Sequence, residues 1–434
     1  MAGKIGPWRR SLPFRTAVAL TVLHLSSLLG SPLVDRAGER LGRVEDLIVR
    51  LADGGFPPVT GLRANIGGRS LFVPVDRIGS LAAGTVALSG EKLDLRRFER
   101  RAGEVLLRED ILGRRLIHVE AARLVTAHDI DLSCVDGWWR VIGIDPRRRA
   151  LIERLLPGRR QPGETPRLIE WTDLEPFVGH VPSSRLRLPS RKLAALHPAQ
   201  IADLVEAASH EEGEEIIKAV GQDRELEADV FEELDEHHQL EFIRERPDDQ
   251  VAQVLARMAT DDAADLVSDI DQERREPVLS LLPAAQGRQI RALLGYNPST
   301  AGGLMSPEVI TLAERQTVGD ALAAVRTSRI GADALTTLYT IGDDGQLTGA
   351  IPIVRLLRAG DADRLGGLAV HEPVAVHTDA DLPEVARLMT DFNLTMLPVL
   401  EEDDHPVGVV TVDDVLELML PTGWRRRFGR VSDD

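Results

Sequence analysis

The segments TDADLPEVARLMTDFNLTMLPVL (residues 378–400) and VGVVTVDDVLELM (residues 407–419) determine the fold of the C-terminal part of this chain. In the first segment, apolar residues at helical spacing are followed by a short apolar run that is typical of a strand. In the second, a β-branched run leads into another helical pattern. The order strand, helix, two strands and helix also occurs earlier, in residues 305–325 and 341–357, so the sequence predicts a duplicated α/β module.

This duplicated pattern resembles a tandem pair of CBS domains, which we place at residues 297–365 and 366–420. The resemblance implies that the two domains dock into a pseudo-symmetric disk with nucleotide clefts. The helices that contain ALAAV and VARLM are rich in apolar residues that need cover. We therefore expect a homodimer through residues 297–420.

Residues 193–296 have a different periodicity, with apolar residues at helical spacing in segments of about ten to twelve residues. Pro198, Pro247 and Pro283 lie where the first turn of a helix tolerates proline. The short connections predict a small α-helical solenoid, and segments such as HEEGEE and TDD make its surface acidic. Residues 183–192, which are basic and rich in proline and serine, are predicted to be a linker.

The acidic helical domain, the junction AGGLMSPE (residues 301–308) and the paired CBS domains follow one another in a distinctive order. Over residues 193–420 this order resembles the cytosolic region of MgtE-type magnesium channels. In that family the channel helices follow the second CBS domain, whereas here only a tail, residues 421–434, follows. We therefore expect a cytoplasmic sensor without the channel and without an integral membrane segment.

The N-terminal half contains a second repeat. Residues 29–49, LGSPLVDRAGERLGRVEDLIV, match residues 112–132, LGRRLIHVEAARLVTAHDIDL, without gaps. The matching pieces are short, β-branched and separated by glycine and proline, which predicts two small β-barrels. We place them at residues 16–100 and 101–182.

The segment VDRAGERLGRVEDLIV resembles the PRC-barrel family, which mostly docks other proteins. The resemblance implies an unidentified protein partner and no catalytic residues. The second copy departs from the pattern, because Ala121 stands opposite the turn glycine Gly38 and an arginine-rich insertion follows. The complete prediction is a multidomain α+β fold with two PRC-like β-barrels, an acidic α-helical solenoid and a tandem CBS pair.

Charge is distributed unevenly along the chain. Residues 1–192 contain 32 Lys and Arg against 22 Asp and Glu, whereas the remainder contains 20 against 47. The acidic part should repel nucleic acid and attract cations. The arginine runs lack the interleaved aromatic residues that stack on bases, so nucleic-acid binding is not expected. The single cysteine, Cys134, fits a reducing compartment.

The acidic residues near position 414 have three interpretations. Thr411 and Asp414 have the spacing of a helix capping box. The CBS resemblance implies a second role, in which Gly408, Thr411 and Asp414 form an adenine-nucleotide element that contacts phosphate and ribose. The first copy lacks this element, since Pro352 and Arg355 replace the threonine and the aspartate.

The third interpretation is a magnesium site. Carboxylates three residues apart share one face of a helix, and the MgtE resemblance places such faces opposite one another across the interface between the helical and CBS domains. Mg²⁺ keeps several water ligands, so one or two carboxylates per ion suffice. The predicted ligands are Asp229, Asp261, Asp262, Asp265, Asp414 and Glu417.

We therefore predict a regulatory protein that senses Mg²⁺ and docks a partner. Two alternatives remain open: a scaffold without a ligand, and a sensor of ATP or AMP that uses the second CBS domain. An enzyme is not expected, because no local motif combines a nucleophile with an oriented base.

Overall fold

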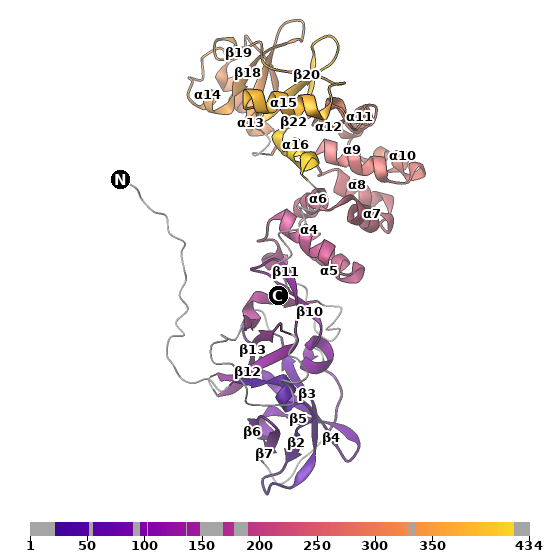
Figure 1. The fold of residues 1–434 in the computed structure, drawn as a ribbon, viewed down its shortest axis with the longest axis vertical. Coiled ribbons are helices and arrows are strands. Elements are labelled where there is room, and N and C mark those ends of the chain that lie inside the picture. Colours follow the sequence, from indigo (N-terminus) through magenta and orange to yellow (C-terminus); the bar gives the residue numbers. More distant parts are fainter. Residues whose placement is uncertain are drawn as a thin grey trace, which may run out of the picture. The chain divides into compact units, whose positions relative to one another are not determined.

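A computed structural model describes most of the chain (Figure 1). The described residues are 22–51, 55–89, 96–101, 103–135, 137–147, 168–177, 190–328, 330–331 and 335–420. The predicted tail, most of the predicted linker and most of the arginine-rich insertion lie outside these residues. The chain divides into two compact units, residues 1–222 and 223–434.

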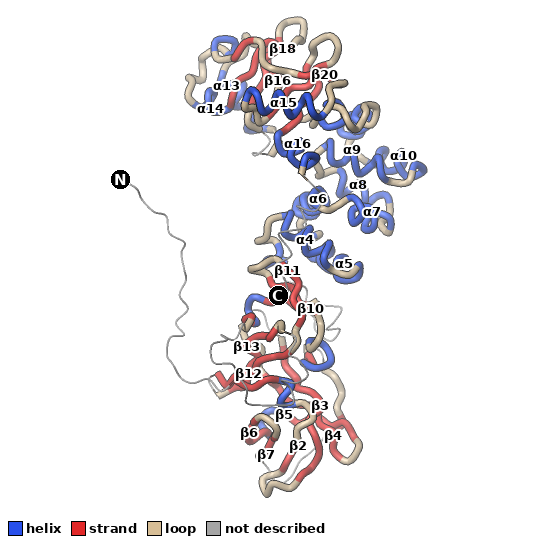
Figure 2. Tube along the Cα trace, viewed as in Figure 1, coloured by secondary structure: helices blue, strands red, loops and turns tan. Residues whose placement is uncertain are grey.

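The first unit is rich in β-structure, drawn in red in Figure 2. Its largest sheet has the order β6-β7-β2-β3-β4-β5-β8, and β9 pairs with β3 outside this path. These strands are β2 (Pro32–Val34), β3 (Arg40–Arg50), β4 (Val59–Ile66), β5 (Arg69–Pro74), β6 (Ile78–Ala82), β7 (Thr85–Leu88), β8 (Arg96–Arg97) and β9 (Glu104–Leu106).

Two smaller sheets complete the β-structure, with the orders β1-β12-β13-β14 and β11-β10-β15. Their strands are β1 (Val22–His24), β10 (Arg115–His118), β11 (Arg123–Thr126), β12 (Asp129–Val135), β13 (Trp138–Asp145), β14 (Ile169–Glu170) and β15 (Leu174–Pro176). Short helical turns lie between the strands: α1 (Leu25–Leu28), η1 (Val75–Arg77), η2 (Leu107–Ile111) and η3 (Trp171–Asp173).

The predicted PRC-like barrels at residues 16–100 and 101–182 are not confirmed. The path through the largest sheet ends at β6 and β8, and the described strands form no closed barrel. Apolar residues from both repeats, from Leu23 to Leu174, instead pack into one hydrophobic cluster. The strands are therefore parts of open sheets that share a core.

The predicted loss of the turn glycine has a structural consequence. Gly38 lies in the first repeat with φ +86°, a conformation that glycine adopts freely. In the second repeat the left-handed residue is Ala122, with φ 46°. A side chain is therefore held where glycine is favoured.

Helices α3 (Ser190–Leu193), α4 (Pro198–Ala207) and α5 (His210–Val220) also belong to the first unit. Arg115 on β10 donates to the Ala207 carbonyl at 3.0 Å and forms an ion pair with Glu212 on α5. Lys192 forms an ion pair with Glu175 on β15 at 2.5 Å. These contacts fix the three helices to the β-structure.

The second unit begins with the rest of the helical region (Figure 1). Its helices are α6 (Arg224–Glu233), α7 (Glu236–Arg244), α8 (Asp248–Leu255), α9 (Thr260–Asp269), α10 (Gln272–Leu281), α11 (Ala284–Leu293) and α12 (Ala301–Leu304). Helices two places apart in the chain contact each other: α6 contacts α8, α7 contacts α9, α8 contacts α10 and α9 contacts α11. Neighbouring helices therefore bury their apolar faces by stacking.

The C-terminal part confirms the duplicated α/β pattern. The first copy contains β16 (Thr311–Ala313), α13 (Val318–Thr327), β17 (Thr337–Ile341), β18 (Leu347–Pro352) and α14 (Ile353–Leu357). The second contains β20 (Val376–His377), α15 (Leu382–Phe392), β21 (Met396–Leu400), β22 (Pro406–Thr411) and α16 (Val412–Met419). A 3-10 turn, η4 (Leu365–Gly367), and strand β19 (Val370–His371) connect them.

Strand pairing is the same in the two copies. β16 is parallel to β17, which is antiparallel to β18, and β20, β21 and β22 repeat this arrangement. The hydroxyl groups of Thr336 and Thr395, which occupy equivalent places before β17 and β21, lie 2.9 Å apart. The copies therefore contact each other through matching residues.

Candidate metal centre

The N-terminus of α9 lies among carboxylates from other parts of the second unit. Glu232 on α6 accepts a hydrogen bond from the backbone N–H of Ala259, the residue before α9, at 2.6 Å. The Thr260 hydroxyl donates to Glu308, in the segment before β16, at 2.9 Å. Acidic groups are favoured at a helix N-terminus, where backbone N–H groups lack partners within the helix. The start of α9 therefore attracts carboxylates.

Asp261, Asp262 and Asp265 are in the first two turns of α9. Asp261 and Asp262 are partly buried, whereas Asp265 is exposed. The Oδ1 atom of Asp261 is buried and has no hydrogen-bond partner among the described residues. A buried carboxylate oxygen without a donor is costly, so the site favours a proton or a cation there.

Asp414 is at the beginning of α16 and completes the predicted capping box. Its Oδ2 atom accepts hydrogen bonds from the backbone N–H and the hydroxyl of Thr411, at 3.0 and 2.8 Å. The Asp414 N–H in turn donates to the Thr411 hydroxyl at 3.4 Å. The capping interpretation of these two residues is confirmed.

The negative charge of Asp414 also contributes to the raised pKa values of the aspartates on α9. Burial raises the pKa of Asp261 to about 6, and the negative charges of Asp414 and Glu308 add to the increase. Burial, followed by the charges of Asp261, Glu232 and Asp414, raises the pKa of Asp262 to about 8. The two helices therefore bring like charges together.

The neighbouring acids show the same effect. Burial raises the pKa of Glu232 to about 7, and the charges of Asp229 and Asp261 contribute. The pKa of Asp265 is raised to about 6, by burial first and then by Asp269 and Asp414. Because the Asp265 side chain is exposed, solvent screens its share of the repulsion.

We name these residues the acidic cluster: Glu232, Asp261, Asp262, Asp265, Glu308 and Asp414. The sequence predicted four of its members, and the structure brings them together. Asp229, also predicted, is an exposed residue on α6 whose charge raises the pKa of Glu232. Glu417 is exposed, three residues beyond Asp414 on α16, and its role as a ligand stays a prediction.

Glu232 and Glu308 were not predicted. Glu232 belongs to a strongly charged helix, and Glu308 follows a proline in a connecting segment. Neither position has a spacing that distinguishes it from the many other acidic residues. Only the distant contacts with Ala259 and Thr260 identify them.

The residues of the predicted nucleotide element already have structural roles. An ideal Cβ atom at Gly408 would lie 2.6 Å from the Ser306 carbonyl oxygen, since Ser306 bridges to β22 beside this glycine. In the first copy, Pro352 ends β18, and Arg355 donates to the Leu368 carbonyl at 2.7 Å. Nucleotide binding at Gly408, Thr411 and Asp414 stays a prediction.

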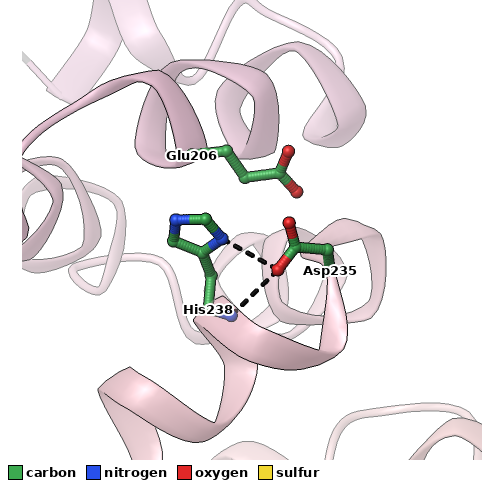
Figure 3. Close-up of side chains that lie close together, drawn as sticks. All are labelled: Glu206, Asp235 and His238. Atoms are coloured by element: carbon green, nitrogen blue, oxygen red, sulfur yellow. Dashed lines mark hydrogen bonds and ion pairs between the residues drawn. The ribbon is translucent and has the colours of Figure 1, made fainter. Parts of the chain in front are cut away.

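Another acidic residue of this unit, Asp235, caps a helix and contacts a histidine. Asp235 precedes α7 and accepts hydrogen bonds from the His238 backbone N–H at 2.9 Å and from the His238 ring at 2.8 Å (Figure 3). This is an N-terminal cap in which the ring and the backbone share one oxygen.

The fold and the acidic cluster define a chain in which an acidic helical domain adjoins a duplicated α/β region. Residues 196–299 match the MgtE intracellular N domain, and residues 365–421 match the CBS domain. About half of the chain is therefore similar to the cytosolic region of MgtE magnesium transporters. None of the helices in the described part of the chain combines the length and the apolar character that a membrane span requires.

Two relatives are magnesium transporters MgtE. The protein of Thermus thermophilus is 31% identical over 195 residues, and that of Bacillus subtilis is 27% identical over 192 residues. Each match covers 44% of this chain but only 43% of the relative. A crystal structure of the cytosolic domain of the Mg²⁺ channel MgtE in complex with ATP has a TM-score of 0.50 and 29% identity; the match covers 53% of this chain and 93% of that one.

Proposed function

We propose that this chain is a regulatory, non-catalytic Mg²⁺ sensor in which the acidic cluster binds the ion. The observation that carries the proposal is the buried Oδ1 atom of Asp261 on α9, which has no hydrogen-bond partner among the described residues. Burial and the charge of Asp414 on α16 raise the pKa of Asp261 and Asp262, in agreement with this observation. Carboxylates from two elements that repel one another are suited to a bridging cation. The homology with magnesium transporters supports Mg²⁺ as that cation.

The chemistry of the donors also favours a hard cation. The cluster offers carboxylate oxygens, and Mg²⁺ prefers oxygen ligands while keeping part of its water shell. Without the ion, repulsion between α9 and α16 favours their separation; with the ion, the closed arrangement is favoured. Mg²⁺ would therefore act by shifting the population between the two arrangements.

The proposal is tested by the free energy of unfolding at increasing MgCl₂, with NaCl of equal ionic strength as reference. Binding to the folded state alone adds about 2.7 kcal/mol at a hundredfold excess over the dissociation constant. Asp414→Asn should reduce this response. Asp391→Asn is the matched control, because Asp391 is an exposed aspartate on α15 that pairs with Arg387, at 3.4 Å. No response of the unmodified chain to Mg²⁺ would leave the scaffold as the better function.

An adenine-nucleotide sensor is the second candidate, because the cytosolic MgtE domain that resembles this chain was crystallised with ATP. Here ATP or AMP would occupy the second CBS copy beside Gly408, Thr411 and Asp414. ATP should then stabilise the chain, and Asp414→Asn should abolish the effect while Glu417→Gln preserves it. Loss of the Mg²⁺ response in both variants, with no response to ATP, would favour the metal site alone.

We further propose a cytoplasmic homodimer that forms through the CBS copies. Helices α14, α15 and α16 carry exposed apolar side chains, which a second copy would cover: Val354, Leu357, Phe392, Leu416 and Met419. Light scattering at micromolar concentration should give the dimer mass. A monomer under these conditions would contradict this part of the proposal.

The β-rich repeats are the proposed docking region for another protein, as their resemblance to PRC barrels implies. Trp138, at the start of β13, is exposed and offers a large apolar side chain suited to such a contact. Co-purification of the full chain with and without Trp138→Ala tests this role. A partner that is retained equally by both chains would place docking elsewhere.

A further inference from the structure

The two β-rich repeats have the same local structure at positions that their sequence match makes equivalent. The Gly30 N–H donates to the Val44 carbonyl at 2.9 Å, and the Gly113 N–H donates to the Ala127 carbonyl at 2.7 Å. The ungapped match places Gly30 opposite Gly113 and Val44 opposite Ala127, and both glycines have positive φ, 76° and 78°. α1 and η2 precede these glycines in corresponding places. The structure is therefore an internal duplication.

Each repeat gives its first strand to the other repeat. β1 precedes α1 in the first repeat but pairs with β12 of the second, in the register Leu23↔Leu132. β9 precedes η2 in the second repeat but pairs with β3 of the first, in the register Ile48↔Leu106. The exchange is thus reciprocal.

A buried aspartate supports each exchanged segment. Asp46 on β3 accepts hydrogen bonds from the backbone N–H groups of Arg108 and Glu109, at 2.8 and 3.1 Å, in the η2 segment of the other repeat. Asp129 on β12 accepts from the backbone N–H and the hydroxyl of Ser26, at 3.1 and 2.5 Å, in the α1 segment of the first repeat.

These aspartates are equivalent in detail. The ungapped match places Asp46 opposite Asp129, and the same alignment, extended to the preceding residues, places Ser26 opposite Glu109. Each aspartate also accepts from the N–H of the next residue, Leu47 or Ile130. Asp46 is 0% and Asp129 4% exposed, so removal of either carboxylate would leave the N–H of a buried residue, Leu47 or Ile130, without this acceptor.

We infer that the repeats are each other's docking partners and form one intertwined pseudo-dimer. The surface that completes each repeat is specific for a second copy of the same repeat: it presents a strand edge for pairing and a buried carboxylate for a short helical turn. The single hydrophobic cluster that contains residues of both repeats agrees with this arrangement. This inference does not depend on the proposed Mg²⁺ site.

The first test is cleavage of the full chain at a protease site inserted between β8 and β9. In an intertwined pair the two pieces remain together on size-exclusion chromatography at high salt and separate only in denaturant. Independent modules joined by a tether would separate under native conditions, and that result would overturn the inference. High salt weakens exposed ion pairs between the repeats, such as Arg63 with Glu109.

The second test uses hydrogen exchange in the full chain. Asp46→Ala should accelerate exchange at the Arg108 and Glu109 amides by about tenfold, the effect of losing one hydrogen bond. Asp129→Ala should act in the same way on Ser26. If Asp46→Ala leaves the chain unfolded, Asp46→Asn, which keeps one acceptor oxygen, provides the measurement.

The matched control is Asp35→Ala. Asp35 accepts from the N–H groups of Ala37 and Glu39 within its own turn, so its removal should affect only that turn. Unchanged exchange at Arg108 and Glu109 in the Asp46 variants would overturn the inference.

Discussion

Asp262 is the residue whose replacement should reveal the repulsion in the acidic cluster. Its pKa is raised to about 8 by burial and then by the charges of Asp261 and Glu232. At pH 7 the unfolded chain ionises this group freely, whereas the folded chain resists ionisation. At pH 7 the group is about three pH units above its ordinary pKa, and each unit corresponds to 1.36 kcal/mol. The free-energy cost that Asp262 imposes on the folded chain is therefore at most about 4 kcal/mol.

Asp262→Asn keeps the volume of the side chain and removes its charge. In the absence of Mg²⁺ the free energy of unfolding of the variant should therefore be higher than that of the unmodified chain by about 2 to 4 kcal/mol. Urea unfolding at pH 7 in the presence of EDTA measures this difference. The same experiment with excess MgCl₂ should stabilise the unmodified chain far more than the variant.

Asp391→Asn provides the control for a general change in net charge. It should leave both the stability without Mg²⁺ and the response to Mg²⁺ close to those of the unmodified chain. A variant Asp262→Asn that had lower stability without Mg²⁺ and an intact Mg²⁺ response would refute the proposed cation site. Asp262 would then be a stabilising residue of α9 and not part of a cation site.

The structure supports three further predictions. The acidic cluster includes pKa values raised to about 6, about 7 and about 8, so the folded chain binds more protons than the unfolded chain. The contribution of the acidic cluster to stability is greatest below pH 4 and is lost as pH rises to about 8. Thermal unfolding in EDTA should show this loss of stability, and the loss should disappear when Mg²⁺ is present. Gly408→Ala should destabilise the second unit by about 1 to 3 kcal/mol through contact with the Ser306 carbonyl, whereas Gly367→Ala, with open space around its Cβ position, should not. Ala122→Gly should stabilise the first unit by about 0.5 to 1 kcal/mol by relieving the left-handed conformation, and an unchanged melting temperature would contradict this.

The duplicated α/β region was predictable because its pattern is local. Apolar spacing in residues 382–392 and the runs at 396–400 and 406–411 fix a helix and two strands without distant contacts. The capping box of Thr411 and Asp414 was predictable for the same reason, since it depends on a spacing of three residues.

The composition of the acidic cluster was only partly predictable. Helical spacing places Asp261 and Asp265 on one face of α9, but it does not identify the acids that approach from elsewhere. Glu232 approaches from α6 and Glu308 from a connecting segment, through contacts separated by 27 and 48 residues. Such pairings depend on how helices pack, which the periodicity of one segment does not specify.

The β-rich repeats show a different limit. The ungapped match identified the duplication, yet two separate barrels and an intertwined pair have the same repeat. Local hydrogen bonds such as Gly30 to Val44 are present in either arrangement. The difference lies in whether Asp46 accepts hydrogen bonds from its own repeat or from the other one, and long-range contacts such as those with Arg108 and Glu109 decide this.

Asp414 shows that helix capping and cation binding are compatible at one residue. Both hydrogen bonds from Thr411 end on Oδ2, so one oxygen is sufficient for the cap. Burial raises the pKa of Asp261 and Asp262 on α9, and the charge of the Asp414 carboxylate adds to the increase. A cation that neutralises this charge does not need to break the cap, and the start of α16 can remain intact while α9 approaches. A cap held by one oxygen therefore gives the proposed sensor a rigid ligand whose position does not depend on the ion.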